Sequence, residues 1–189
     1  MKELLDRLLE RLDNAKRVVF LGLGEVKMTD DGVGVYVATE LLDKSDDNVL
    51  VMNAGVDPMA RMDEIVDFNP SHLIIIDTCT LNQEPGTVSI IERKNMADLV
   101  PISTHTVPIH VIIDLLVEKI PDLDVFMLGI VPKSLDGIYD LDQYKENELT
   151  IDEINADKDL PFFSIELTDI IQDTADRLIR MINKLIQEI

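Results

Sequence analysis

The sequence predicts an α/β fold in three layers: a mostly parallel, twisted β-sheet of about five strands with helices on both faces. Short apolar runs alternate along the chain with segments of helical periodicity. Runs of this kind are typical of buried parallel strands. We expect one domain over residues 1–189, because no repeat, low-complexity tract or linker divides the chain.

The individual elements follow from these patterns and from the residues that interrupt them. Pro58 opens one helix, Asn69-Pro70 ends it, and Thr106 is the expected cap of another, with Pro108 in its first turn. The strand after the turn at Pro85-Gly86 has the partial alternation of an edge strand. We expect strands over 18–21, 49–52, 73–76, 86–91 and 125–130, and helices over 4–14, 33–43, 58–69, 107–119 and 170–186.

Two segments stand apart from this core. Residues 1–14 form an N-terminal helical extension, in which leucines recur at helical spacing. Residues 136–161 are acidic and have no clean period, so we expect an acidic surface insertion there.

The charge of the chain is strongly acidic. Asp and Glu number 37 against 17 Lys and Arg, which gives a formal net charge of −20. Such a field repels phosphate backbones and anionic lipid, so nucleic acid is excluded as a partner and membrane insertion is not expected. The ordinary interpretation is a solvated surface that keeps the protein in solution; a cation or a basic peptide would also be attracted.

Three features of the sequence indicate a cytoplasmic protein. No apolar run approaches the roughly 20 residues that cross a bilayer. Residues 1–7 have the pattern of a charged amphipathic helix and not that of a signal peptide. Cys79 is the single cysteine, which rules out an internal disulfide.

A candidate site follows from three segments that a parallel sheet brings to one edge. Asp30 and Asp31 lie in the glycine-rich loop after the first strand, and Asp77 ends the central strand. The carboxyl ends of parallel strands meet at one edge, where ligands gather in open α/β sheets. His105 precedes a helix that crosses back over the sheet, so its loop could reach this edge too. Two carboxylates and an imidazole would form an open site for a divalent first-row metal.

Each of these features also has a structural explanation. Asp-Asp-Gly is a common turn and capping sequence, and a loop histidine can simply be hydrogen-bonded. Cys79 and His105 could form a nucleophilic pair, although a buried, inert cysteine fits the position better. His110 is placed within a helix and His72 at the opposite end of its strand, so neither is a candidate ligand. Nucleotide-binding glycine motifs are incomplete, so no cofactor-binding residues are assigned.

Five motifs in order, over about residues 17 to 135, resemble those of the hydrogenase maturation proteases. The turn and acidic segment read Gly22-Leu23-Gly24-Glu25 and Asp30-Asp31-Gly32-Val33-Gly34, with Glu25 where the family usually has Asn. The remaining motifs are Asn53-Ala54-Gly55, Leu73–Asp77 followed by Pro85-Gly86-Thr87, Ser103-Thr104-His105, and Leu128–Pro132, in which Val131 replaces a frequent Gln. The segment around His105 is most similar to the branch that serves formate-hydrogenlyase-type hydrogenases.

The resemblance implies an endopeptidase that removes the C-terminal tail of a nickel–iron hydrogenase large-subunit precursor after nickel insertion. The nickel-binding positions carry over to Asp31, Asp77 and His105, which would also be the catalytic residues, and Asp30 would cap or support its loop. Nickel would be supplied by the substrate precursor, with no permanent catalytic metal, and the protease would be a monomer. The alternative is a non-catalytic, metal-binding hydrogenase assembly factor that uses the same three residues only to bind.

Overall fold

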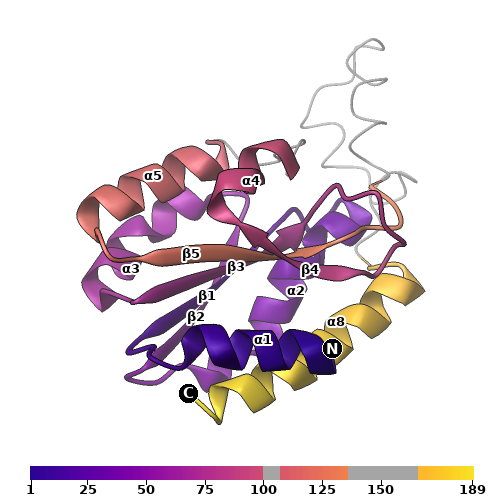
Figure 1. Cartoon of the computed structure of the whole chain (residues 1–189). Coiled ribbons are helices and arrows are strands. Elements are labelled where there is room, and N and C mark those ends of the chain that lie inside the picture. The colour runs from indigo at the N-terminus through magenta and orange to yellow at the C-terminus, as the bar shows by residue number, and fades with distance from the viewer. Residues whose placement is uncertain (100–106, 136–165) are drawn as a thin grey trace, which may run out of the picture.

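The central sheet is mostly parallel, as predicted. The computed structural model describes residues 1–99, 107–135 and 166–189, and within these ranges the sheet has five strands in the order β2-β1-β3-β5-β4 (Figure 1). β1 pairs in parallel with β2 and β3, β3 pairs in parallel with β5, and β4 runs antiparallel to β5 at the edge. The strands are β1 (Val18–Leu23), β2 (Val49–Gly55), β3 (His72–Thr78), β4 (Val88–Glu92) and β5 (Asp124–Ile130).

Helices cover both faces of this sheet, which confirms the three-layer prediction (Figure 1). One face carries α1 (Lys2–Leu12), α2 (Val33–Glu40) and α8 (Asp169–Ile186). The other face carries α3 (Met62–Phe68), α4 (Arg93–Leu99) and α5 (Ile109–Lys119).

The central strands are buried on both sides because successive side chains point to opposite faces. On β1, Phe20 packs in the cluster beneath α1, α2 and α8, and Val19 packs in the cluster beneath α3, α4 and α5. Phe126 of β5 lies with Phe20, and both rings are fully buried. This double burial explains why the strands read as continuous apolar runs.

The structure differs from the prediction at several element ends. Helix α4 was not predicted, because Met96 is its one buried residue and a single apolar position gives no periodicity. Helix α5 begins at Ile109, two residues later than expected, with Pro108 at its N-cap position. The predicted helix over 33–43 ends at Glu40 and is followed by a short 3-10 turn, Leu42–Lys44. The expected cap Thr106 and the predicted insertion 136–161 lie outside the described residues.

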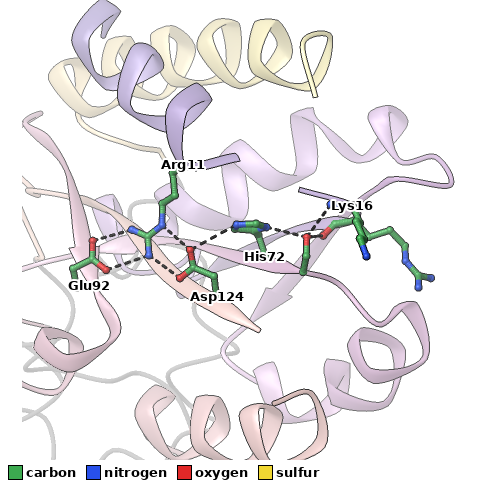
Figure 2. A network of polar contacts seen from close by, with 7 residues as sticks. Arg11, Lys16, His72, Glu92 and Asp124 are labelled. Carbon is green, nitrogen blue, oxygen red and sulfur yellow. Dashed lines mark hydrogen bonds and ion pairs between the residues drawn. The ribbon is translucent and has the colours of Figure 1, made fainter. Parts of the chain in front are cut away.

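Helix α1, which contains most of the predicted N-terminal extension, is fastened to the sheet by Arg11 (Figure 2). The guanidinium donates two hydrogen bonds to Asp124, of 2.8 and 2.7 Å, and two to Glu92, of 2.8 and 3.1 Å. It also lies 4.0 Å from the centre of the Phe126 ring. These contacts join α1 to the start of β5 and the end of β4. No helix in the described part of the chain is long and apolar enough to cross a membrane.

Candidate functional site at the carboxyl edge of the sheet

The turn after β1 is built by a very close approach of two backbones. Gly24 has φ +124°, and a Cβ placed there would lie 1.8 Å from the carbonyl oxygen of Asp31. A side chain at this position would be both strained and sterically excluded, so glycine is required. The turn therefore brings the backbone of the acidic loop directly against the end of β1.

The acidic loop is a short 3-10 helix, η1 (Thr29–Gly32), that leads into α2. A Cβ on Gly34, in the first turn of α2, would lie 2.0 Å from the carbonyl oxygen of Ile76 in β3. Helix α2 thus touches the backbone of the central strand, one residue before Asp77. This contact places the loop that carries Asp31 beside the end of β3.

Asp31 and Asp77 are both buried, each with 3% of its surface exposed. Thr78, the last residue of β3, donates its backbone N–H to Asp77 Oδ1 at 2.7 Å and its hydroxyl to Asp31 Oδ1 at 3.3 Å. Asp31 Oδ2 accepts a further hydrogen bond of 2.8 Å from the backbone N–H of Glu25. The two predicted acids are therefore brought together at one edge and linked through one threonine.

Asp30 has a different role from Asp31. It is fully buried, and its carboxylate accepts four hydrogen bonds of 2.8 to 3.1 Å. The donors are the backbone N–H groups of Lys133, Ser134 and Thr168 and the hydroxyl of Thr168. Asp30 thus fastens η1 to the segment after β5 and to the N-cap of α8, which is the supporting role expected for it.

His105, the third predicted residue, lies outside the described residues. The described chain before it, however, ends at the same edge, because the carbonyl oxygen of Leu99 accepts a 2.8 Å hydrogen bond from the backbone N–H of Thr80. Thr80 follows β3 by two residues. In the described part of the chain no group of three or more His, Cys, Asp or Glu residues is arranged to hold a metal ion. The structure therefore brings two of the three predicted residues together, and the complete trio stays a prediction.

The remaining titratable candidates are placed as the sequence suggested. Cys79 is buried beside Gly129, and burial, with a further contribution from the charge of Asp77, raises the pKa of its thiol to about 12. A thiol with that pKa is protonated and unreactive near neutral pH. His110 is exposed on α5, and His72 begins β3 at the opposite edge of the sheet. None of these side chains is a member of the acidic site.

Sequence reasoning missed two contributions to this site. Thr78 was not singled out, although a hydroxyl residue directly after a strand-ending aspartate is a usable signal. Glu25, which replaces the Asn usual in the family, accepts a 3.1 Å hydrogen bond from the backbone N–H of Lys27 through its side chain. The turn is thereby closed by its own side chain while the backbone of Glu25 binds Asp31.

A cavity of about 630 Å³ lies next to the acidic loop, between α2 and the start of α8. Thr29 and Gly32 of η1 form part of its wall, together with Tyr36 and Leu167. Among the described residues that line it, three are acidic and none is basic; the acids are Glu40, Glu166 and Asp169. The space beside the site is thus partly apolar and acidic.

Fold and site together define a three-layer α/β protein with paired buried carboxylates at the carboxyl edge of its sheet. The sequence profile described as HycI, hydrogenase maturation protease, matches residues 35–154. The chain therefore belongs to the hydrogenase maturation protease family, and it is a hydrolase of the endopeptidase type.

Individual relatives agree with this assignment. The chain is 33% identical, over 144 residues, to a candidate hydrogenase maturation protease of Methanocaldococcus jannaschii, covering 72% of this chain and 82% of the relative. It is 30% identical, over 125 residues, to the hydrogenase 3 maturation protease of Escherichia coli K12, covering 66% and 79%.

Solved structures show the same fold. The crystal structure of the [NiFe] hydrogenase maturation protease HycI from Thermococcus kodakarensis superposes with a TM-score of 0.73 at 22% identity, covering 96% of this chain and 99% of that one. The solution structure of the endopeptidase HycI from Escherichia coli gives 0.64 at 24% identity, covering 87% of each chain.

Proposed function

We propose that this protein removes the C-terminal tail of a nickel–iron hydrogenase large-subunit precursor after nickel insertion. It would recognise the bound nickel through Asp31, Asp77 and His105. The observation that carries the proposal is the pairing of two buried carboxylates at the edge where α/β sheets bind ligands. Membership of the protease family, and the name of the Escherichia coli relative, support the choice of substrate.

The chemistry of the donors fits nickel that is carried by the substrate. Carboxylate oxygen and imidazole nitrogen are suitable ligands for divalent first-row metals, whereas thiolates bind such ions more strongly. An Asp/Asp/His set can therefore contact an ion that the precursor already holds without removing it. The tail would be cut only from precursor that carries its metal.

His105 enters this proposal through the described residue that precedes its segment, Leu99. The backbone N–H of Thr80 donates a hydrogen bond to the carbonyl oxygen of Leu99, so Leu99 lies at the acidic edge. The family resemblance assigns the same residue. Replacement of His105 by Ala should abolish processing and leave the fold intact.

Peptide hydrolysis at such a site needs an activated water molecule. A water near the carboxylates can attack the scissile carbonyl carbon, forming the new C–O bond, while Asp31 or Asp77 accepts the proton. That proton then passes to the leaving amine as the C–N bond breaks. Either carboxylate is a candidate for this base, because both lie at the end of β3, where each hydrogen-bonds to Thr78.

The direct test is the intact mass of a large-subunit precursor incubated with this protein, with and without prior nickel insertion. Loss of a C-terminal tail only from nickel-loaded precursor is the expected result. Loss from both forms would contradict nickel recognition but not the protease activity. No mass change, with a precursor shown to bind the protein, would favour the assembly factor that the sequence left as the alternative.

Variants separate the roles of the candidate residues. Asp31→Asn and Asp77→Asn should each lower processing by at least about 100-fold if the carboxylates supply the base or contact nickel. Cys79→Ser should process normally, since the thiol is buried and protonated at neutral pH. Loss of activity in Cys79→Ser with full activity in both aspartate variants would instead indicate a cysteine hydrolase.

The cellular setting of the reaction is also part of this proposal. We expect the protein to act as a monomer in the cytoplasm, where nickel would be inserted into the precursor. A mass measured by light scattering in solution tests the oligomeric state.

A further inference from the structure

Thr78 hydrogen-bonds to both candidate acids at this edge. Its backbone N–H reaches Asp77 at 2.7 Å, and its hydroxyl reaches Asp31 at 3.3 Å. Only 8% of its surface is exposed, so these bonds are largely shielded from water. In such surroundings a hydrogen bond is stronger than on the surface and its geometry is better defined.

The carboxylate of Asp31 is held from two sides. Oδ2 accepts from the backbone N–H of Glu25 at 2.8 Å, and Oδ1 accepts from the Thr78 hydroxyl. Glu25 belongs to the turn after β1 and Thr78 ends β3, so each oxygen is bound by a different segment. A carboxylate anchored at both oxygens loses the freedom to rotate about its terminal bond.

We propose that Thr78 is a positioning residue that fixes the orientation of Asp31 relative to Asp77. Thr78 itself does not act on the substrate; it acts through the two acids. The consequence for catalysis rests on the proposed function above, whereas the consequence for the geometry of Asp31 does not. Orientation of this kind matters because small displacements of a reacting group can lower a rate strongly.

Two substitutions at Thr78 isolate its hydroxyl. Thr78→Val has nearly the same shape, suits a strand end and keeps the backbone bond to Asp77. Thr78→Ser removes a methyl group and keeps the hydroxyl. The matched control is Thr174→Val on α8. Thr174 is fully buried, and its hydroxyl donates to the backbone carbonyls of Ile170 and Gly86 and to neither candidate acid.

The kinetic test compares these variants in processing of nickel-loaded precursor. For Thr78→Val we expect kcat to fall about tenfold with KM changed less than about twofold, because substrate contacts are kept and orientation is lost. Thr78→Ser and Thr174→Val should stay within about twofold of the unaltered protein. Equal kcat for Thr78→Val and the unaltered protein would overturn the proposal.

A second measurement does not depend on protease activity. Hydrogen exchange of the Glu25 amide, followed by NMR, reports on its bond to Asp31 Oδ2. If the Thr78 hydroxyl holds Asp31, this amide should exchange about five times faster in Thr78→Val and at the normal rate in Thr78→Ser and Thr174→Val. If the unaltered protein cleaves no precursor, the proposed function fails, and unchanged Glu25 exchange in Thr78→Val would then reject the positioning role as well.

Discussion

Single glycines decide how closely the elements around the acidic site approach one another. A Cβ added to Gly34 would lie 2.0 Å from the carbonyl oxygen of Ile76, and one added to Gly24 would lie 1.8 Å from the carbonyl oxygen of Asp31. Neither position can accept a side chain without a shift of the backbone. The sequence motif that contains these glycines is thus explained by backbone packing. Its effect on function is indirect, because it sets where Asp31 lies relative to β3.

Gly34→Ala should lower the free energy of unfolding by at least about 3 kcal/mol, because helix α2 would have to move away from the sheet. Urea unfolding measures the change. The control is Gly55→Ala: Gly55 has φ +53° but nothing within 4 Å of an added Cβ, so only a backbone cost of about 1–2 kcal/mol is expected. Equal losses in the two variants would contradict the steric explanation.

Asp30→Asn tests the buried acceptor that supports the loop. The amide cannot accept all four hydrogen bonds, and its NH₂ group would face backbone donors, so we expect a loss of about 2–4 kcal/mol in unfolding free energy. Asp173→Asn, at an exposed acid on α8, should change stability by less than about 0.5 kcal/mol. A loss below about 1 kcal/mol for Asp30→Asn would show that these bonds contribute little.

Among the elements, helix α1 depends most clearly on one side chain for its attachment. Its leucines pack against α8 and the sheet, and Arg11 adds the contacts with Asp124, Glu92 and Phe126 shown in Figure 2. The hydrogen bond with Asp124 raises the pKa of Arg11, and the same bond lowers the pKa of Asp124. The N-terminal extension is therefore an integral layer of the core.

Arg11→Lys should lower the unfolding free energy by about 1–2 kcal/mol, although the charge is kept. An ammonium group cannot form the paired bonds to two carboxylates that the planar guanidinium forms. Arg7→Lys, on the exposed side of the same helix, is the control and should stay within about 0.5 kcal/mol. Thermal or urea unfolding of both variants measures the difference, and equal effects would contradict a specific role for Arg11.

At the scale of the whole molecule, we expect stability to depend on pH through the half-buried His72, at the edge opposite the acidic site. Burial lowers the pKa of His72 below its usual 6.5, an effect that outweighs the opposing influence of Asp124. Its ring also lies 2.9 Å from the Ser71 hydroxyl and 3.7 Å from Asp124, with Arg11 nearby (Figure 2). The folded protein therefore keeps this imidazole neutral at a pH where the unfolded chain already binds a proton.

The sign of the effect follows from that difference. Stability from neutral His72 is fully present above pH 6.5 and is lost as pH falls through 6.5 toward the lowered pKa. Between pH 7.5 and 5.5 the unfolding free energy of the unaltered protein should thus fall more than that of His72→Gln. His110→Gln, at an exposed histidine, should keep the full dependence. If the unfolding free energy of His72→Gln falls between pH 7.5 and 5.5 as much as that of the unaltered protein, this assignment is contradicted.

The sequence by itself determined which apolar runs are strands, which periodic segments are helices, and that Asp31 and Asp77 lie at one edge of the sheet. Buried strands and amphipathic helices leave patterns in the chain, and Asp31 and Asp77 could be placed at one edge because parallel strands end together. Helix α4 could not be predicted, since it buries one residue. The register of the sheet and the position of β4 beside β5 likewise leave no local signal.

Only the tertiary structure decided how the acids are held. The links from Thr78 to Asp31 and from Asp30 to Thr168 join residues 47 and 138 positions apart in the chain. Such pairings depend on the packing of α2 against β3 and of α8 against α2, and no sequence period encodes them. The same holds for Arg11 and Asp124, because a contact between distant segments exists only once the layers have assembled.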